Sequence, residues 1–262
     1  MSDKTKLSII KIGGNVIDDP LALSSFLKDF SKIPGFKILV HGGGKEATRL
    51  AGKLGVETIM VEGRRVTNEE MLDVAVMTYA GLCNKKIVAQ LQDYDTQAIG
   101  LTGADGNSIR SEKRKLGRYN YGFVGDVVEV NSEWIKRLLD TEAVPVFCAI
   151  THDKKGQLLN TNADTIAQSL AVGLTALFDV SLTYCFEKKG VLSDSNDDNS
   201  VLENLNFNLY EKLKSENIIH SGMLPKLENC FQALREGVKE IRIANPEILA
   251  NPKALHTHVS LY

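Results

Sequence analysis

The sequence lacks the features of a membrane-spanning, secreted or zinc-bound protein. No apolar run approaches the roughly 18 residues of a membrane span, and the opening MSDKTK has no apolar stretch of the kind that signal peptides carry. The four cysteines form no CxxC pair, and the histidines other than His41 have no acidic or cysteine partner at ligand spacing. We therefore expect a cytoplasmic protein with reduced, mostly buried thiols and no structural metal.

Strong net charge and the common nucleotide signatures are also missing. The 31 Lys and Arg and 33 Asp and Glu give a formal charge of -2, which offers no electrostatic case for nucleic acid or an anionic membrane as the main partner. A Walker A motif needs a glycine five residues before Gly44, where the chain has Leu39. The turn at Gly13 lacks the third glycine of GxGxxG. If this protein is an enzyme that binds phosphate, it must use a phosphate-binding motif other than these two.

Two glycine-rich turns, each after a short apolar run, are the strongest positive signal. Lys11 is followed by Gly13 and Gly14, and His41 is followed by the glycines 42–44. Glycine lets a strand-to-helix turn bring its N–H groups against an anion, and the next helix adds the positive end of its dipole. Tight turns without a ligand are the alternative, but two in succession, one with a lysine, favour phosphate binding. His41 itself fits a structural hydrogen-bonding role.

Strand-like and helix-like segments alternate along the chain. This alternation predicts an α/β fold with a largely parallel, helix-covered sheet, as one core or as two lobes that divide near Leu177. The expected strands are residues 7–12, 36–41, 98–102, 144–150, 181–187 and 240–243, and the expected helices are residues 21–31, 46–54, 68–92, 132–139, 164–172 and 223–237.

The longest expected helix covers residues 68–92. Thr67 and Glu70 have the spacing of a capping box, and the helix carries more apolar side chains than a one-sided stripe needs. We therefore expect it to be buried on several sides or to lie at a subunit interface. The polar and basic stretch 107–126 predicts a mobile hairpin or a plain solvated loop.

Two charged residues stand at expected helix starts. Asp164 ends the segment Asn-Thr-Asn-Ala-Asp, where an acid is by default an N-cap or first-turn residue. Lys226 lies in the first turn of the last long helix, where a cation is mildly unfavourable. A bound anion would remove that conflict, and a solvated lysine is the alternative.

Taken together, these segments resemble the amino acid kinase superfamily and, within it, the acylglutamate kinases. The similarity runs from about Ser8 to Ile243. Two motifs distinguish the acylglutamate kinases from the rest of the superfamily: Gly-Arg-Arg-Val-Thr at 63–67 and Asn-Thr-Asn-Ala-Asp at 160–164. The resemblance implies a three-layer α/β/α sandwich of the carbamate kinase type. It also implies that ATP, with Mg²⁺ on its phosphates, phosphorylates the side-chain carboxylate of N-acetylglutamate or a related N-acylglutamate in arginine biosynthesis. Another superfamily kinase, such as glutamate 5-kinase, and a non-catalytic nucleotide-binding sensor are the alternatives.

The resemblance assigns roles to individual residues. Lys11 and Lys226 would hold the transferring group from opposite sides, and Asp164 would orient both lysines. Residues 1–177 would form a lobe for acylglutamate binding and dimerisation, and residues 178–262 a lobe for ATP. The resemblance implies contacts to three ligand groups. The contacts to the phosphoryl group would be Gly13, Gly14, Gly43 and Gly44, and those to the amino acid would be Gly43, Gly44, Arg65 and Asn160. The contacts to ATP would be Glu187, Gly190, Val191, Leu192, Ser221, Gly222, Met223 and Lys226.

The chain also departs from the family pattern. Residues 186–190 read Phe-Glu-Lys-Lys-Gly where relatives have Thr-Asp or Ser-Asp before the glycine, and residues 256–262 lack a glycine-rich ending, which leaves the adenosine contacts and a final strand open. Arg64 and Lys45 are extra cations beside the amino-acid segments. They are either surface charges or contacts for a further carboxylate, as in N-succinylglutamate.

The resemblance also bears on the oligomeric state. In the family that the chain resembles, members that arginine inhibits are hexamers built on an extra N-terminal helix. Only six residues precede the first expected strand, about one and a half helical turns at most. We therefore expect a homodimer that arginine does not inhibit.

Overall fold

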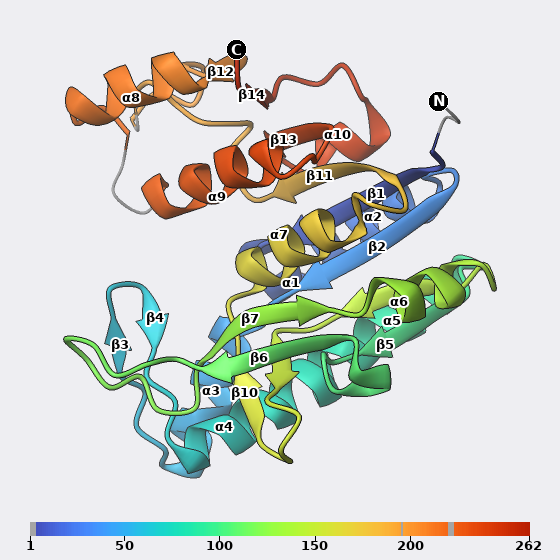
Figure 1. The fold of residues 1–262 in the computed structure, drawn as a ribbon, viewed down its shortest axis with the longest axis vertical. Coiled ribbons are helices and arrows are strands. Elements are labelled where there is room, and N and C mark those ends of the chain that lie inside the picture. Colours follow the sequence, from blue (N-terminus) through green and yellow to red (C-terminus); the bar gives the residue numbers. More distant parts are fainter. Residues whose placement is uncertain (1–3, 195, 220–222) are drawn as a thin grey trace.

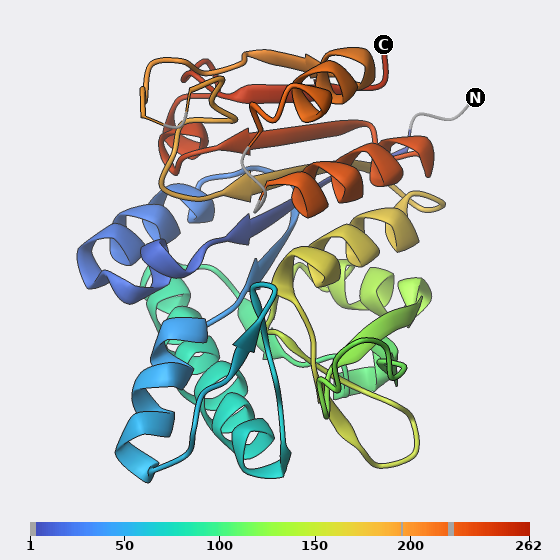
Figure 2. The ribbon, with the colours of Figure 1, turned by 90° about the vertical axis from the view of Figure 1, so that its left-hand side faces the viewer.

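The structure, a computed structural model, describes residues 4–194, 196–219 and 223–262. Its centre is an eight-stranded sheet in which all neighbouring strands run parallel except β13 and β14 (Figures 1 and 2). The expected largely parallel sheet is therefore confirmed. In spatial order the strands are β12 (Asn204–Asn206), β14 (Thr257–Ser260), β13 (Glu240–Ala244), β11 (Asp179–Cys185), β1 (Lys6–Ile12), β2 (Phe36–His41), β8 (Val144–Phe147) and β5 (Ala98–Leu101).

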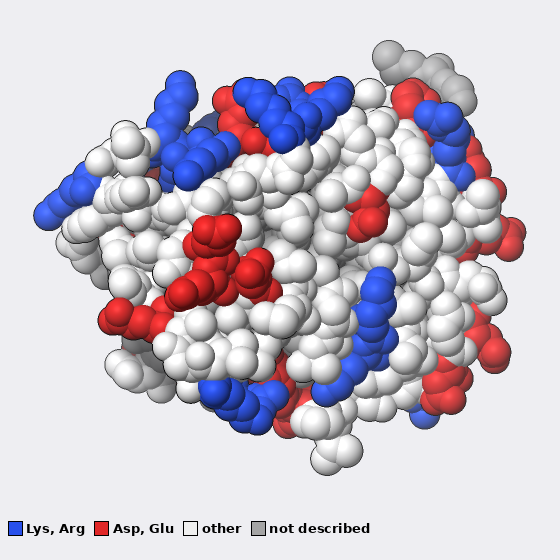
Figure 3. Space-filling view, turned by 90° about the horizontal axis from the view of Figure 1, so that it is seen from below, with Lys and Arg blue, Asp and Glu red and all other residues white. Residues whose placement is uncertain are grey.

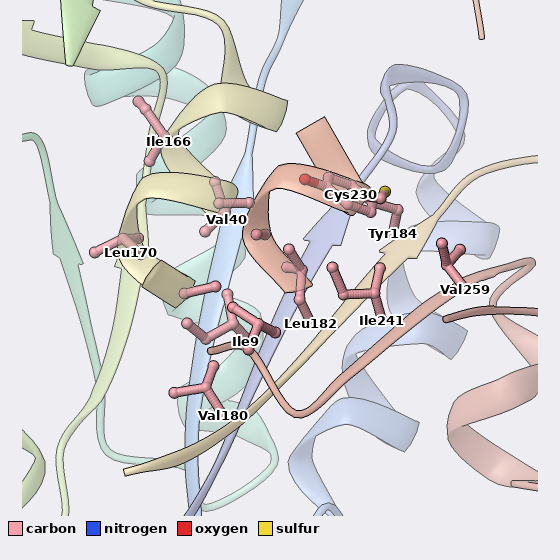
Figure 4. Close-up of a cluster of buried hydrophobic side chains, with 14 of the residues drawn as sticks. Ile9, Val40, Ile166, Leu170, Val180, Leu182, Tyr184, Cys230, Ile241 and Val259 are labelled. Carbon is pink, nitrogen blue, oxygen red and sulfur yellow. The ribbon is translucent and has the colours of Figure 1, made fainter. Parts of the chain in front are cut away.

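Helices cover both faces of this sheet. Successive residues of a strand point to opposite faces, so Ile9 and Ile10 of β1 enter two different apolar cores, and both are buried. Figure 4 shows the Ile9 core, which also contains Val40, Leu182 and Tyr184. The Ile10 side is packed by α1 (Gly14–Asp18), α2 (Pro20–Ser31), α5 (Asn84–Asp93) and α10 (Glu247–Ala250), and the Ile9 side by α6 (Ser132–Leu139), α7 (Ala163–Leu174), α8 (Phe207–Ser215) and α9 (Leu224–Arg235). The three-layer α/β/α arrangement is confirmed.

Two smaller sheets lie beside the main one. Strands β6 and β7 form an antiparallel hairpin at the two ends of the stretch 107–126, and the loop that connects them, residues 114–124, makes up most of that stretch. The four-stranded sheet runs β10 (Leu158–Asn160), β9 (Ile150–His152), β6 (Ile109–Lys113) and β7 (Gly125–Val130), with the short helix η2 (Asp105–Asn107) before β6, and β3 (Met60–Val61) pairs with β4 (Arg64–Arg65).

Two expectations about strands need correction. The single strand expected over residues 144–150 is two strands, because β8 ends at Phe147 and Ile150 begins β9 in the second sheet. Both pieces are apolar and buried, so hydropathy marks no break between them. The final strand that the sequence left open does form: β14 pairs antiparallel with β13.

The longest helical stretch is continuous but not uniform. Helix α4 (Glu69–Ala75) runs into a π-helical segment, η1 (Val76–Cys83), and then into α5. The capping-box prediction was wrong: the N-cap is Asn68, whose side chain accepts the N–H of Met71 at 2.9 Å, while Thr67 is buried. None of the described helices has the length and apolar character needed to cross a bilayer.

The two predicted lobes share the main sheet. Strand β1, from residues 1–177, pairs along its whole length with β11, from residues 178–262. The proposed boundary falls between α7 and β11, in the turn that follows Leu174. Within the described ranges the four cysteines, Cys83, Cys148, Cys185 and Cys230, are unbridged and buried as expected.

Candidate active site

The second glycine turn is shaped by the π-helical segment that packs against it. Gly43 has φ +151°, and a Cβ there would stand 2.9 Å from the ring of Tyr79 and 3.2 Å from Sγ of Cys83. Only glycine avoids this clash while adopting that backbone conformation. Helix α3 (Gly44–Leu54) begins directly afterwards, so its unpaired N-terminal N–H groups open at this turn.

The first glycine turn offers fewer N–H groups than we expected. The N–H of Gly13 donates to the carbonyl of Cys185 at 2.8 Å, so it continues the pairing of β1 with β11. The expectation that Gly13 presents its N–H to a phosphoryl group is therefore wrong for this arrangement. Gly14 is the first residue of α1, where an N–H has no partner within the helix.

Asp164 lies between Lys11 and Lys226. One carboxylate oxygen is 2.7 Å from Nζ of Lys11 and the other is 3.5 Å from Nζ of Lys226. Burial would raise the pKa of Asp164, but attraction and hydrogen bonding by the two lysines outweigh it and lower the pKa below its ordinary value. The carboxylate thus stays ionised and holds two ammonium groups near one point.

Three elements far apart in the sequence place these charges. Lys11 lies in β1, which is paired on both sides. Asp164 lies in the first turn of α7, whose N-cap is Asn162: its side chain accepts the N–H of Asp164 at 2.7 Å. Lys226 lies in the first turn of α9, with Nζ 5.2 Å from the ring centre of Phe186. Asp164 is therefore a first-turn residue rather than the cap.

A cavity of about 220 Å³ opens at the start of α3. This volume is below the roughly 300 to 1,000 Å³ of pockets for drug-sized ligands, so it suits a small metabolite. Its wall contains four residues that the family resemblance assigns to the amino acid, Gly43, Gly44, Arg65 and Asn160. Ala163, next to Asp164, also lines it.

Arg65 and Asn160 are fixed by one hydrogen-bond network. The Arg65 guanidinium donates to the Gly44 carbonyl and to Oγ1 of Thr48, both at 2.8 Å. Nδ2 of Asn160 donates to Oγ1 of Thr67 at 3.0 Å, and that hydroxyl donates to the Arg65 carbonyl at 3.1 Å. Both side chains are therefore oriented before any ligand binds.

Sequence reasoning missed some wall residues and left the position of Lys45 open. Tyr79, Asn162 and Arg114 also line the cavity. The signal for Arg114 was the basic stretch, within which nothing distinguished it from its neighbours. Lys45 is not among the lining residues: its Nζ bonds to Oδ1 of Asn15 and lies 3.6 Å from Asp18. Lys45 therefore does not serve as a cation of this cavity.

The residues assigned to ATP lie along the chain after β11 and at the start of α9. Glu187 accepts a hydrogen bond from Nδ2 of Asn15 at 2.5 Å. Val191 is buried in the core, and its N–H donates to Oγ1 of Thr257 at 2.8 Å. Gly190 and Leu192 flank Val191, and Met223 is the N-cap of α9, whereas Ser221 and Gly222 lie outside the described residues. The ATP contacts stay a prediction.

His41 is a structural hydrogen-bonding residue, as the sequence predicted. It is fully buried: Nδ1 faces the Gly42 carbonyl at 2.7 Å, and Nε2 faces Nδ2 of Asn84 at 3.0 Å. The amide nitrogen can only donate, so Nε2 accepts and the proton sits on Nδ1. Burial lowers the pKa of His41 from 6.5 to about 4. The ring is therefore neutral at pH 7.

This burial predicts a pH-dependent stability. Between pH 6.5 and 4 the unfolded chain binds a proton at His41 that the native state does not bind, so the free energy of unfolding falls as the pH falls through this window. The loss is up to about 3 kcal/mol. Urea unfolding at several pH values measures it. A His41→Gln variant should lose less stability over the same window, and an identical pH slope in the two proteins would contradict this account.

Comparisons with known proteins agree with this arrangement. The model of the amino acid kinase family matches residues 6–245. An acetylglutamate kinase of Phocaeicola vulgatus is 53% identical over 240 residues, 92% of this chain and 93% of that protein. One of Bacteroides fragilis is 49% identical over 254 residues, 97% and 95% of the two chains. Carbamate kinase from Giardia lamblia bound to AMP-PNP shares the fold, with TM-score 0.73, 13% identity and coverage of 100% of this chain and 99% of that one.

The family match spans most of the chain, and the relatives align over almost their whole length. The chain therefore belongs to the amino acid kinase family, and it is an enzyme of the kinase class. The carbamate kinase-like fold inferred from the resemblance is confirmed.

Proposed function

We propose that this kinase transfers the γ-phosphoryl group of ATP to the side-chain carboxylate of an N-acylglutamate, as a step of arginine biosynthesis. The observation that carries the proposal is the Lys11–Asp164–Lys226 cluster next to a small cavity with a buried arginine. The named relatives add that closely similar chains are acetylglutamate kinases.

The chemistry asks little of the protein beyond position and charge. A carboxylate oxygen of the substrate attacks the γ-phosphorus, the bond from that phosphorus to the β,γ-bridging oxygen breaks, and ADP leaves with the electron pair. A carboxylate is ionised at pH 7, so no general base is needed. Lys11 and Lys226 would neutralise charge on the transferring oxygens, and Asp164 would keep both ammonium groups aimed at them.

The amino acid would be held in the cavity. Arg65 would pair with the α-carboxylate through its planar, two-pronged donor, and Asn160 would contact the same molecule. The N-terminal N–H groups of α3, at Gly44, would face the reacting carboxylate. These residues all belong to residues 1–177, which we propose as the amino-acid lobe, with residues 178–262 as the ATP lobe.

Mg²⁺ belongs on the ATP phosphates in this scheme. The carboxylate of Asp164 is committed to two lysines, and phosphate oxygens are the usual Mg²⁺ ligands in kinases. When bound there, the ion neutralises phosphate charge. We place the reaction in the cytoplasm, where ATP is available.

A coupled ADP-release assay tests the proposal. The acceptors to compare are N-acetyl-L-glutamate, N-succinyl-L-glutamate, L-glutamate, L-aspartate and UMP. We expect turnover with an acylated glutamate and little with the other three. Preferred use of free glutamate would indicate glutamate 5-kinase, and no ADP release with any acceptor would indicate a nucleotide-binding sensor.

We also propose a homodimer formed through the long helical stretch. Most apolar side chains of α4 and η1 are buried, but Met77 and Leu82 are 49% and 39% exposed. A two-fold contact would cover both on each subunit. Light scattering should give twice the mass of the chain, and Met77→Lys with Leu82→Lys should halve it. Leu21→Lys, an exposed control on α2, should not, and a monomeric wild type would refute the dimer.

A further inference from the structure

The cavity wall is strongly basic. Arg64, Arg65 and Arg114 all line it, and none of its lining residues in the described ranges is Asp or Glu. Figure 3 views the molecule from below and shows Lys and Arg along the upper left edge, with a group of Asp and Glu beneath them on the same side, where Figure 1 places β3, β4 and the loop between β6 and β7. The cavity is therefore suited to a ligand with several negative charges.

The charges of an N-acylglutamate do not account for all three arginines. Such a substrate has two carboxylates, of which one reacts beside the glycine turns and the other is assigned to Arg65. The guanidinium of Arg114 already forms a bidentate ion pair with Asp126, with Nε 3.1 Å from each carboxylate oxygen. None of the ion pairs in the described ranges involves Arg64. Arg64 is thus the cation left without a countercharge.

The position of Arg64 is set by the backbone. It lies in β4, paired with Val61 of β3, and only partly exposed. The chain after β4 is tied to the loop that carries Arg114, because the N–H of Thr67 donates to the Tyr121 carbonyl at 2.9 Å. The two arginines therefore stand on connected segments at one cavity. A partly buried guanidinium gains most when a carboxylate is available to accept its hydrogen bonds.

We propose that the preferred N-acyl group of the substrate ends in a carboxylate, and that Arg64 binds this group with Arg114 beside it. This inference rests on the proposed acylglutamate kinase activity and specifies its substrate class. Arg64 is then a specificity-determining residue: it contacts the part of the acyl group that does not react. Arg65 keeps its role with the α-carboxylate.

The test compares kcat/KM for three acceptors: N-succinyl-L-glutamate, N-acetyl-L-glutamate and N-succinamoyl-L-glutamate. The succinamoyl compound matches the succinyl compound in shape but has a neutral amide in place of the terminal carboxylate. We expect the succinyl substrate to exceed both others by about 10-fold or more, the scale of a lost charge-assisted contact. This comparison needs only the wild-type enzyme, so it stands even if a variant fails to fold.

A charge-matched pair of variants assigns the effect to Arg64. Arg64→Gln should remove most of the preference for succinyl over succinamoyl and leave the acetyl value within about threefold. Lys115→Gln removes the same charge from the exposed part of the basic loop and should change none of the three values. Equal losses for all acceptors in Arg64→Gln would overturn the proposal.

The outcomes separate this inference from the activity on which it rests. If N-acetylglutamate is phosphorylated and the succinyl compound is no better than its neutral analogue, the inference is wrong and the kinase activity stands. If no acylated glutamate gives ADP, the proposed activity fails and the inference falls with it.

Discussion

Replacing Lys11 or Lys226 with alanine is expected to lower kcat by on the order of 10²-fold or more. Each ammonium group lies within 3.5 Å of the Asp164 carboxylate, and in the proposed mechanism both would neutralise charge on the transferring phosphoryl group. Removal of one preorganised charge of this kind lowers kcat by roughly 10²-fold. Steady-state kinetics with saturating ATP and acylglutamate measure it.

The control is a lysine that takes no part in the cluster. Lys53, exposed near the end of α3, should give wild-type kcat when it is replaced with alanine. Thermal unfolding of each variant separates lost chemistry from lost structure. Normal turnover in a folded Lys11→Ala or Lys226→Ala protein would refute the role of the pair.

Arg65→Ala is expected to raise KM for the acylglutamate by about 10²-fold and to change kcat at saturation much less. The guanidinium is buried in the cavity wall and would bind the α-carboxylate, which takes no part in bond making. Removing one partner of a desolvated charge pair costs a few kcal/mol of binding. A contact present equally in the ground state and the transition state appears in KM.

The matched variant is Arg65→Lys. It keeps the positive charge but loses the forked geometry in which Nη2 donates to the Gly44 carbonyl and Thr48 while Nη1 donates to Oγ1 of Thr58. We expect an intermediate KM for the amino acid and an unchanged KM for ATP in both variants. A fall in kcat with no change in KM would place Arg65 at the reacting group instead.

Much of the fold could be predicted because apolar periodicity reports burial directly. Strands β1 and β2 are buried on both faces, and such strands read as short apolar runs. The same signal cannot say which sheet a buried strand joins, which is why the sequence predicts a single strand over residues 144–150. The short strands β3 and β4 have two residues each and leave no periodic pattern.

The candidate site, like the fold, could be predicted in part from the sequence. Lys11 lies in a strand just before a glycine turn, and Asp164 and Lys226 lie in the first turns of helices, so their importance could be inferred. The distances between them depend on how β1, α7 and α9 pack. The N–H of Gly13 could not be judged from sequence, because its use depends on the carbonyl of Cys185 across the sheet. The sequence could not show that the Lys45 ammonium group contacts Asn15 and Asp18 instead of the cavity, because that depends on where these two residues lie in the fold.

The most direct test of the central claim is to identify the product of the reaction. An acyl phosphate reacts with hydroxylamine to give a hydroxamate, which can be quantified beside ADP in the same sample. The account predicts one hydroxamate for each ADP with an N-acylglutamate acceptor, and loss of both products in Lys11→Ala. Steady ADP release without hydroxamate would contradict phosphoryl transfer to a carboxylate.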